Sequence, residues 1–409
     1  MKRLFQNSII CHGIGIIGSV LLIHIFTGWR STLPITVVNS MWIISTAYIG
    51  ASLTIPKITN YLLVDRKFYI LPVLASLYAF AMALILLLRI EYSREILIYG
   101  FLLHLLWMYV SAIFRGEQYK MKLTAIDNFS VENLHAKHAR LELKILENLD
   151  LRAAQDGLVV DLHGKLSAEQ EKFIADCSIN NIPVFHSESI REMVEGKVQT
   201  LHLSENYIGT LTPNPIYHKI KRLWESVLIL ASFPITLPIM AITAILIKIE
   251  NPGPAMFIQE RVGQGGKAFR IYKFRSMTVK SKDAEDKFAT EEQARVTRVG
   301  KVIRKVRIDE LPQFFNVLKG EMSLIGPRPE QESFVIQFEQ EIPFYGYRHM
   351  VKPGITGWAQ TVQGYADDTD STREKLAHDL YYIKHLSFWL DMNIVIKTIK
   401  TMLTGFGAK

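Results

Sequence analysis

The sequence predicts a chain of three parts: an α-helical membrane domain with four spans, a small α/β domain, and an α+β domain attached to one face of the membrane by a re-entrant helix hairpin. Three observations predict this architecture. Residues 1–115 contain four long apolar runs, residues 156–210 alternate strand-like with helix-like segments, and residues 215–409 join an uncharged run to a strongly basic remainder. Apolar runs of this length are typical of membrane helices, and alternating strands and helices are typical of α/β domains.

The composition supports membrane residence. The chain of 409 residues carries a formal charge of +8 and a mean hydropathy of +0.15, a combination that is unusual for a soluble protein of this size. The basic residues flank apolar segments, and no stripe of aromatic residues interleaves with them, so nucleic acid is not an expected partner. Cys11 and Cys177 lie far apart without a partner motif, and we interpret them as reduced packing residues.

The four apolar runs comprise residues 4–26, 35–55, 68–88 and 96–114. Each is long enough to cross the hydrocarbon layer, which is roughly 30 Å thick, as a helix. Basic residues are concentrated before the first run, between the second and third, and after the fourth, which places the N-terminus and everything after Phe114 in the cytoplasm. An interfacial or helix-packing role is favoured over a functional one for the three histidines of these runs, which are His12, His24 and His104.

Residues 116–155 are polar, and the helical spacing of apolar residues over 131–149 predicts a linker helix. Residues 156–210 predict a small parallel, Rossmann-like domain in which Ser167 caps a helix. A dinucleotide site would need a glycine-rich turn after the first strand, and only Gly164 stands there, so a scaffolding or regulatory role is favoured over nucleotide binding. The expected strands are residues 157–163, 182–186 and 198–203, and the expected helices are residues 167–178 and 187–195.

The segment 219–248 contains a run of 22 uncharged residues. Its length alone predicts a transmembrane helix, but Pro234 and Pro238 at its centre each remove a backbone donor and bend a helix. Basic residues lie at both ends, and a complete crossing would put the basic region that follows outside the cell. We therefore expect a helix–break–helix hairpin that returns to the same face, with Ser232 and Pro234 at the break; a Pro-kinked span is the alternative.

Beyond the hairpin, basic residues gather around one acidic pair. Lys273 and Arg275 alternate on one face of a strand-like segment, where they would hold a phosphate; a solvated strand face is the alternative. The run that precedes the pair Asp309-Glu310 is uninterrupted by acid and contains Arg295, Arg298, Lys301, Arg304, Lys305 and Arg307. Cations that hold substrate oxygens, beside carboxylates that bind a metal or attack phosphorus, suit phosphate chemistry.

The acidic pair has two interpretations. Asp309 stands just before a helix-like segment, where Asp is a preferred cap and Glu is favoured in the first turn. The same helix start would attract phosphate, and the basic run would keep both carboxylates ionised. Asp309 would then act as a nucleophile, while Glu310 would bind Mg²⁺, which prefers few carboxylates together with substrate oxygens.

Four ordered motifs resemble the bacterial sugar transferases, the monotopic polyprenyl-phosphate glycosyl-1-phosphate transferases. They are KFRSM (273–277), RIDELPQFFNVLKGEMSLIGPRP (307–329), KPGITGWAQ (352–360) and DLYYIKHLSFWLD (379–391). The resemblance extends from about residue 219 to the C-terminus. The four spans and the small α/β domain are similar to long-form members that prime exopolysaccharide, capsule or O-antigen synthesis. The resemblance implies an enzyme of the bacterial inner membrane, with its catalytic domain in the cytoplasm, that transfers a sugar-1-phosphate from a UDP-sugar to undecaprenyl phosphate and releases UMP.

The resemblance also implies roles for individual residues. It places the covalent nucleophile at Asp309 and the Mg²⁺-associated carboxylate at Glu310, with Mn²⁺ as an alternative ion. The Pro-Arg-Pro motif falls on Pro327, Arg328 and Pro329, and Arg328 is expected at the nucleotide. The cations expected around the phosphates are Lys273, Arg275, Arg304 and Arg328, and the residues expected at the hairpin break are Ser232, Pro234 and Pro238.

The C-terminal part carries three weaker signals. Residues 388–406 predict an amphipathic helix that lies on the bilayer, and packing against the core is the alternative. Trp358, in the third motif, would shape a sugar pocket or lie at the membrane interface, although packing is as common a role. A solvated loop is favoured over sugar contact for the acidic cluster of Asp367, Asp368 and Asp370.

We expect a two-step transfer in which Asp309 briefly carries the phosphosugar. One rival is a direct displacement that uses Mg²⁺ without a covalent intermediate. The other is a non-catalytic membrane scaffold whose basic region binds anionic lipid. The expected partners are the UDP-sugar, undecaprenyl phosphate and the bilayer, and further candidates are a second copy of the chain and downstream glycosyltransferases. No motif identifies the sugar.

Overall fold

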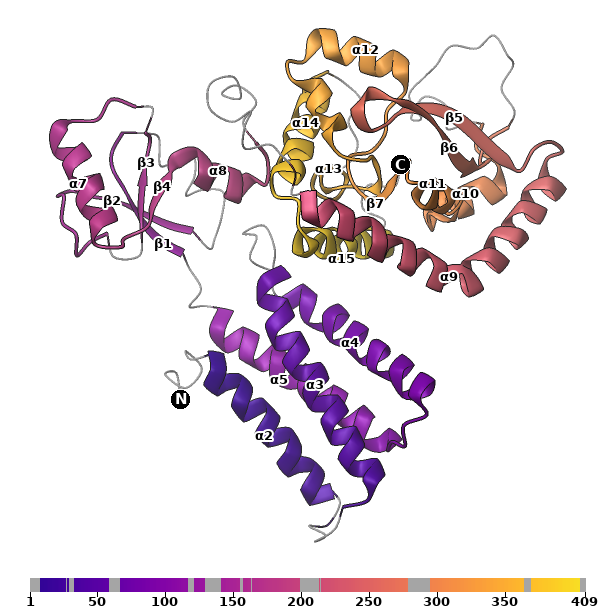
Figure 1. Ribbon diagram of the computed structural model, residues 1–409, viewed down its shortest axis with the longest axis horizontal. Helices are drawn as coiled ribbons and strands as arrows, with labels where there is room; N and C mark the ends of the chain where they lie inside the picture. The colour runs from indigo at the N-terminus through magenta and orange to yellow at the C-terminus, as the bar shows by residue number, and fades with distance from the viewer. Residues whose placement is uncertain are drawn as a thin grey trace. The chain divides into compact units, whose positions relative to one another are not determined.

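The fold is described here from a computed structural model (Figure 1). The structure describes residues 8–26, 28, 33–58, 67–116, 121–128, 141–154, 157–162, 164–198, 213, 215–278, 295–363 and 369–404. The chain divides into two compact units, residues 1–195 and residues 196–409. The first unit contains the N-terminal helices and a parallel sheet, and the second contains the acidic pair.

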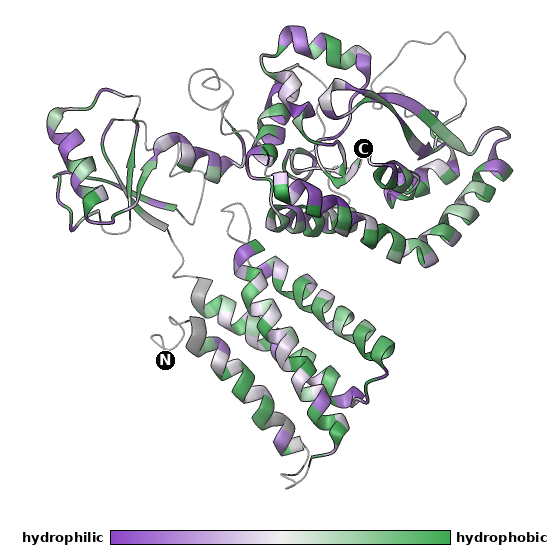
Figure 2. Ribbon diagram, in the orientation of Figure 1, coloured by the Kyte–Doolittle hydropathy of each residue, from purple (hydrophilic) through white to green (hydrophobic). Residues whose placement is uncertain are grey.

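The N-terminal helices are α2 (Ser8–Phe26), α3 (Ile35–Ile58), α4 (Lys67–Leu88) and α5 (Arg94–Gly116). Helix α3 packs against α4 and α5, and α2 packs against α5. Apolar residues dominate all four helices in Figure 2. By length and composition α3, α4 and α5 are able to cross a membrane, and the described side chains of α2 give a shorter apolar stretch. The prediction of four apolar helices is confirmed.

Polar side chains inside this bundle bond to one another. The ring of His104 is fully buried, and its two nitrogens lie 2.7 Å from Ser19 Oγ and 3.0 Å from Tyr78 Oη. His12 Nδ1 lies 3.1 Å from the hydroxyl of Tyr48. These contacts join α5 to α2 and α4, and α2 to α3, so they fit the packing role expected for His12 and His104.

The sheet of the first unit is parallel throughout and has the strand order β2-β1-β3-β4. The expected strands at 157–163 and 182–186 are present as β3 (Leu158–Val160) and β4 (Val184–His186), and the expected helices as α7 (Ala168–Ile179) and α8 (Ser187–Glu195). Ser167 caps α7 and forms a capping box with Gln170, as predicted. Of the third expected strand, 198–203, only Val198 lies among the described residues, and it is not in a strand.

The prediction of a linker helix over 116–155 is wrong, because two strands of the sheet lie there. They are β1 (Met121–Ala125) and β2 (Leu141–Ile145). Along β2, Leu141 and Leu143 are buried while the residues between and after them are exposed, a period of two that short strands show. Residues 131–140 of the stretch that carried the helical spacing, 131–149, lie outside the described residues.

Helix α9 (Pro215–Glu250) is continuous, so the predicted break does not interrupt it. Pro234 and Pro238 lie inside the helix and remove two backbone donors. The hydroxyls of Ser232 and Thr236 donate to the carbonyls of Ile229 and Ser232. Both features bend helices, and Figure 1 shows α9 turning in its middle. One bent helix therefore replaces the two helices and break that were expected.

One stripe of α9 is buried, and most of its apolar surface is not. The stripe includes Ile229, Met240 and Ile247, which pack into two clusters of the second unit's core. Large apolar residues on the other faces are exposed, among them Ile235 and Ile242. A helix whose exposed side is this apolar is suited to a lipid environment.

The rest of the second unit is a small α+β body. An antiparallel hairpin, β5 (Met256–Val262) and β6 (Ala268–Phe274), lies on one side, and the parallel pair β7 (Ser323–Ile325) and β8 (Gly354–Thr356) lies elsewhere. The helices are α10 (Arg298–Lys305), α11 (Gln313–Lys319), α12 (Glu332–Glu341), α13 (Trp358–Val362), α14 (Thr369–Lys384) and α15 (Phe388–Thr404).

Helix α15 packs one face against the core. Leu390, Asp391 and Ile394 are buried, and the helix contacts α13, β7 and β8. Its other face exposes Phe388 and Ile399. The alternative of core packing therefore holds for one face of the helix, and contact of the other face with the bilayer stays a prediction.

Candidate active site

A strained turn presents the acidic pair. Arg307 adopts the left-handed conformation, with φ 58° and ψ 19°, and a single 3₁₀ turn, Ile308–Glu310, follows it. Helix α11 begins later, with Pro312 in the cap position. Asp309 therefore is not the N-cap of α11, and the capping interpretation is wrong. A non-glycine residue with positive φ costs energy and is often found at functional sites.

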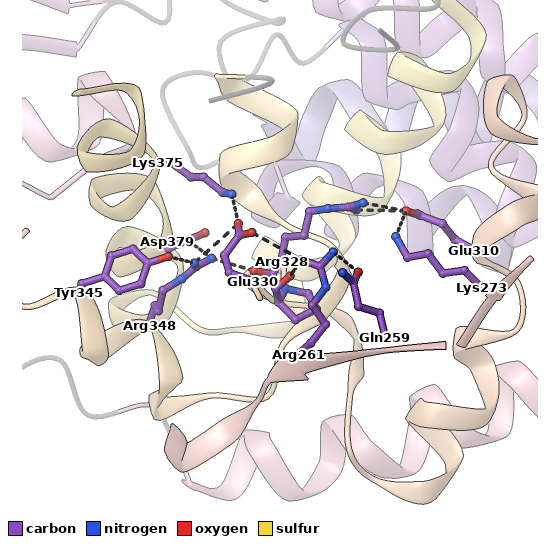
Figure 3. Close-up of polar contacts among 11 residues, drawn as sticks. Gln259, Arg261, Lys273, Glu310, Arg328, Glu330, Tyr345, Arg348, Lys375 and Asp379 are labelled. Atoms are coloured by element: carbon purple, nitrogen blue, oxygen red, sulfur yellow. Dashed lines mark hydrogen bonds and ion pairs between the residues drawn. The ribbon is translucent and has the colours of Figure 1, made fainter. Parts of the chain in front are cut away.

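Three cations surround Glu310, and Figure 3 shows two of them, Lys273 and Arg328. Both terminal nitrogens of Arg328 donate to Glu310 Oε1, each at 3.1 Å. The ammonium of Lys273 lies 3.4 Å from the same oxygen, and Arg307 Nη1 lies 3.7 Å from it. Lys273 comes from strand β6, Arg307 from the loop after α10, and Arg328 from the loop after β7. Three separate segments thus converge on one carboxylate oxygen.

Asp309 lies beside this cluster with an oxygen that is not paired. Its Oδ1 atom is buried and has no hydrogen-bond partner among the described residues. A buried carboxylate oxygen is usually hydrogen-bonded, because leaving it without a partner is costly. An unpartnered oxygen next to fixed positive charge is available to react with a substrate or to bind an ion.

The two carboxyl groups titrate differently. Burial, and then the neighbouring charge of Glu310, raise the pKa of Asp309 to about 6. Burial opposes ionisation of Glu310 as well, but Arg328 and Lys273 outweigh it and lower the pKa of Glu310 to about 2. Burial and Arg328 also lower the pKa of Lys273 to about 8. The expectation that the basic run keeps both carboxylates ionised therefore holds for Glu310 and only weakly for Asp309.

Two predicted cations lie elsewhere. The guanidinium of Arg275 donates to the carbonyls of Asn251 and Pro252, at 2.5 and 3.4 Å, where α9 ends. Arg304 is half-buried on α10, and its side chain forms no ion pair within the part of the chain that the structure describes. Of the four cations expected around the phosphates, the structure brings only Lys273 and Arg328 to the acidic pair.

Arg307 was part of the quoted basic run, but its role was not predicted. The left-handed backbone at Arg307 turns the chain so that its side chain faces Glu310 three residues later. Sequence alone gives no signal for this, because Arg is not a residue that typically marks a positive φ.

The Pro-Arg-Pro segment is held by its backbone. The carbonyl of Pro327 accepts from Gly354 N at 2.9 Å, and the carbonyl of Pro329 accepts from Arg261 Nη1 at 3.3 Å. The carbonyl of Arg328 accepts from Arg348 Nη2 at 2.8 Å. The two prolines thus fix the loop, and only Arg328 directs its side chain to the acidic pair.

A second ion network supports this loop from behind. Arg348 is almost fully buried and donates to Asp379 Oδ2 at 3.0 Å and to the hydroxyl of Tyr345 at 2.6 Å. Glu330, directly after the Pro-Arg-Pro segment, pairs with Lys375 at 2.5 Å and lies 3.9 Å from Arg348. The neighbouring cations lower the pKa of Glu330 to about 2 despite its burial. The sequence does not predict this network (Figure 3), because its members are spread over three segments without a shared motif.

Glycines in the third motif allow the backbones to touch. A Cβ atom on Gly354 would lie 2.0 Å from the nitrogen of Gly326, and one on Gly357 would lie 2.4 Å from the carbonyl oxygen of Gly326. Residues 352–357 thus pack directly against the start of the Pro-Arg-Pro loop. Trp358 is fully buried, and its Nε1 donates to the carbonyl of Gly196 at 2.7 Å, so it packs and does not line a sugar pocket. Asp370 is exposed, as expected, and Asp367 and Asp368 lie outside the described residues.

The donor set suits Mg²⁺ better than a metal that needs many protein ligands. No group of three or more His, Cys, Asp or Glu side chains gathers in the described residues. Two adjacent carboxylates, one with an unpartnered oxygen, remain. Mg²⁺ binds through one or two carboxylates together with substrate phosphates, so the residues present fit that ion.

Comparisons with known proteins agree with this geometry. Residues 216–405 match the family model described as "Bacterial sugar transferase". The UDP-N-acetylgalactosamine-undecaprenyl-phosphate N-acetylgalactosaminephosphotransferase of Aeromonas hydrophila is 50% identical over 343 residues, which are 83% of this chain and 81% of that protein.

Two further relatives match less than half of the chain. The UDP-glucose:undecaprenyl-phosphate glucose-1-phosphate transferase of Escherichia coli (strain K12) is 42% identical over 183 residues, 44% of this chain and 39% of that protein. The exopolysaccharide production protein PSS of Rhizobium leguminosarum bv. phaseoli is 37% identical over 191 residues, 45% of this chain and 96% of that protein. The match to the family model, together with a relative that is 50% identical over most of both chains, shows that the chain belongs to the bacterial sugar transferase family and is a transferase.

Proposed function

We propose that this protein transfers a sugar-1-phosphate from a UDP-sugar to undecaprenyl phosphate and releases UMP. The observation that carries the proposal is the acidic pair: a buried, unpartnered oxygen of Asp309 beside a carboxylate that three cations surround. This arrangement combines a nucleophile with fixed positive charge for a phosphoryl group. The names of the relatives, which are phosphotransferases that use undecaprenyl phosphate, support the same reaction.

The reaction proceeds in two displacements at one phosphorus atom. A carboxylate oxygen of Asp309 attacks the β-phosphorus of the UDP-sugar, and the bond from that phosphorus to the bridging oxygen breaks, so UMP leaves with that oxygen. A phosphate oxygen of undecaprenyl phosphate then attacks the same phosphorus. The aspartyl–phosphorus bond breaks, Asp309 regains its carboxylate, and the lipid carries a diphosphate-linked sugar. Dividing the transfer in this way lets a soluble donor and a membrane-bound acceptor use one site in turn.

The electrostatics of the site serve both displacements. The raised pKa of Asp309 makes its carboxylate a better nucleophile than an exposed one, and the low pKa of Glu310 keeps that group anionic. Arg328 is partly exposed, and together with Lys273 it lies where phosphate oxygens would enter. Glu310, with Asp309 beside it, would hold Mg²⁺ or Mn²⁺, and the ion would supply further charge neutralisation for the phosphates.

N-acetylgalactosamine is the first sugar to test. The relative that matches 83% of this chain is named for that sugar, whereas the glucose-specific relative matches 44%. The lipid-linked product would prime a polysaccharide and would be extended by other glycosyltransferases. The relative named as an exopolysaccharide production protein supports this setting.

The bent helix α9 would enter the membrane and return to the same face. Its apolar exposed surface, its two central prolines and the basic residues at both ends support this. The catalytic unit would then lie on the cytoplasmic face of the inner membrane, where UDP-sugars are made. A cysteine placed at Lys267 should be inaccessible to a membrane-impermeant label added to intact cells, and labelling there would overturn the arrangement.

Release of UMP by the purified full chain tests the activity. With undecaprenyl phosphate and Mg²⁺, we expect turnover of UDP-N-acetylgalactosamine to exceed that of UDP-glucose. Asp309→Asn should abolish UMP release, whereas Asp370→Asn, which neutralises an exposed acid, should leave it unchanged. UMP release by Asp309→Asn at the parental rate would exclude Asp309 as the nucleophile.

Omitting the acceptor separates the remaining mechanisms. With UDP-sugar labelled in the sugar, covalent transfer leaves label on the protein that survives denaturation, and Asp309→Asn removes it. Direct displacement leaves the protein unlabelled although turnover with acceptor persists. A non-catalytic scaffold releases no UMP from any UDP-sugar.

A further inference from the structure

Two cations lie next to each other near the start of α9, and neither has an ion-pair partner within 4 Å among the described residues. Arg222 is on α9, and Lys352 is on the segment that leads into β8. A Cβ atom built on Gly320 would lie 3.0 Å from Arg222 Nη2 and 3.5 Å from Lys352 Nζ, so both charges face the same spot. Within the described residues neither side chain forms an ion pair or a hydrogen bond.

The nearest acid is already used. Glu225, one turn beyond Arg222, accepts from the hydroxyl of Ser323 at 2.7 and 2.9 Å and from Leu324 N at 3.1 Å, and it lies 3.8 Å from Lys221. Burial and the charge of Arg222 lower the pKa of Lys352, and the charge of Glu225 opposes this shift only in part. Paired cations in this state favour the binding of an anion.

The surroundings indicate the depth at which the anion would bind. Leu223, Val227 and Leu230 follow Arg222 on the same helix at a spacing of three to four residues, and all are exposed. Trp224 packs edge-on against Phe388 of α15, with ring centroids 6.0 Å apart. Trp is enriched at the level of the headgroups. A cationic pair above an exposed apolar strip suits a phosphate that carries a long hydrocarbon chain better than it suits a free phosphate ion.

The pair also borders the catalytic loop. The carbonyl oxygen of Lys352 lies 2.5 Å from the position of a Cβ atom on Gly326, the residue before the Pro-Arg-Pro segment. The backbone of Lys352 therefore contacts the start of that loop, while Arg328 extends to the acidic pair.

We propose that Arg222 and Lys352 form a binding site for the phosphate of a lipid, and that this site receives the polyprenyl phosphate acceptor at the membrane surface before transfer. The identity of the lipid as acceptor rests on the proposed function, whereas the phosphate site rests only on the geometry. Glycerophospholipids share the phosphate chemistry, so the experiment must separate the two sources.

The test uses the full chain in nanodiscs of phosphatidylcholine. The variant Arg222→Gln/Lys352→Gln removes both charges, and the matched control Lys219→Gln/Lys267→Gln removes two exposed charges from α9 and from the β5–β6 turn. Loss of charge-assisted contacts to a phosphate should raise the KM for undecaprenyl phosphate about tenfold. The amount of UMP released in one turnover without acceptor should stay within about twofold, since the donor site is untouched. Lys352→Arg keeps the charge and should keep the parental KM.

Direct binding keeps the test independent of turnover. Nanodiscs that contain the Asp309→Asn variant should bind radiolabelled undecaprenyl phosphate. This binding should weaken about tenfold when Arg222 and Lys352 are also replaced with Gln. If the parent binds the lipid but releases no UMP, the proposed function fails and the phosphate site stands. If phosphatidylglycerol competes equally well and the acceptor KM is unchanged, the site binds phospholipid and its assignment to the acceptor is overturned. Equal binding by the double variant and its control would overturn the site itself.

Discussion

The ion pair between Lys221 and Asp391 gives the sharpest prediction of stability. Lys221 is 5% exposed and Asp391 is 0% exposed. The ammonium donates to Asp391 Oδ2 at 2.7 Å, to the hydroxyl of Tyr382 at 2.6 Å and to the carbonyl of Ile325 at 2.8 Å. The pair joins α9 to α15. Removing Asp391 would leave Lys221 with only the longer ion pair to Glu225, at 3.8 Å, and removing Lys221 would leave Asp391 buried without its cation.

The magnitude follows from the burial of both charges. Breaking a buried pair from one side costs about 3–5 kcal/mol, and removing both partners costs much less than twice that. For a unit of about 200 residues, 1 kcal/mol corresponds to a shift of about 2–4 °C in Tm. Lys221→Met and Asp391→Asn should each lower the Tm by at least about 6 °C. The double variant should lose clearly less than the sum of the two.

Thermal unfolding of the detergent-solubilised full chain measures these shifts. Lys219→Met, an exposed lysine two residues away on α9, is the control and should change the Tm by less than about 2 °C. Single variants that unfold at the parental temperature would refute the reasoning. So would a double variant whose loss equals the sum of the single losses, because independent effects would mean that the two charges do not compensate each other.

Three further predictions concern the loop and its supports. Gly326→Ala should reduce turnover at least tenfold, because its Cβ would lie 2.5 Å from the carbonyl oxygen of Lys352. The control is Gly346→Ala, whose Cβ meets only a side-chain oxygen at 3.3 Å. Equal turnover rates of the two variants would contradict the prediction. Arg275→Ala should lower the Tm without changing the KM for the UDP-sugar, whereas Lys273→Met should impair UMP release. A raised KM for the UDP-sugar in Arg275→Ala would show that Arg275 does contact the substrate. Arg348→Met should lower the Tm by at least about 6 °C, because it leaves Asp379 buried without its ion pair, and an unchanged Tm would show that Asp379 is neutral in the folded state.

Local patterns predicted the elements that depend on local chemistry. Ser167 with Gln170 three residues later is a capping box in the sequence, and it is one in the structure. The four apolar runs and the strands at 157–163 and 182–186 follow in the same way from composition and length. Strand β2 was missed because its two buried leucines were read together with a longer helical spacing, and its pairing with β1 depends on residues that lie twenty positions away.

The candidate site was predicted where one motif carries it. Asp309, Glu310 and Arg328 are close in sequence, and the structure brings them together. Arg275 looked equivalent to Lys273, since the two are spaced as one face of a strand. However, β6 ends at Phe274, and Arg275 donates to the carbonyls of Asn251 and Pro252 instead. Arg348 and Asp379 could not be found from sequence, because their pairing depends on the packing of α14 against the segment Tyr345–Met350.

The buried contacts of α9 connect the membrane to the chemistry. Lys221 donates to the carbonyl of Ile325, and Glu225 accepts from Leu324 N and from the hydroxyl of Ser323. The three residues that these side chains contact, Ser323, Leu324 and Ile325, make up β7. The chain leads from β7 directly into the loop that carries Arg328. If α9 enters the bilayer as proposed, its height there would fix the height of Arg328. A lipid phosphate cannot leave the headgroup plane without exposing its chain to water, so a site joined rigidly to α9 would meet the proposed acceptor without a large movement of either.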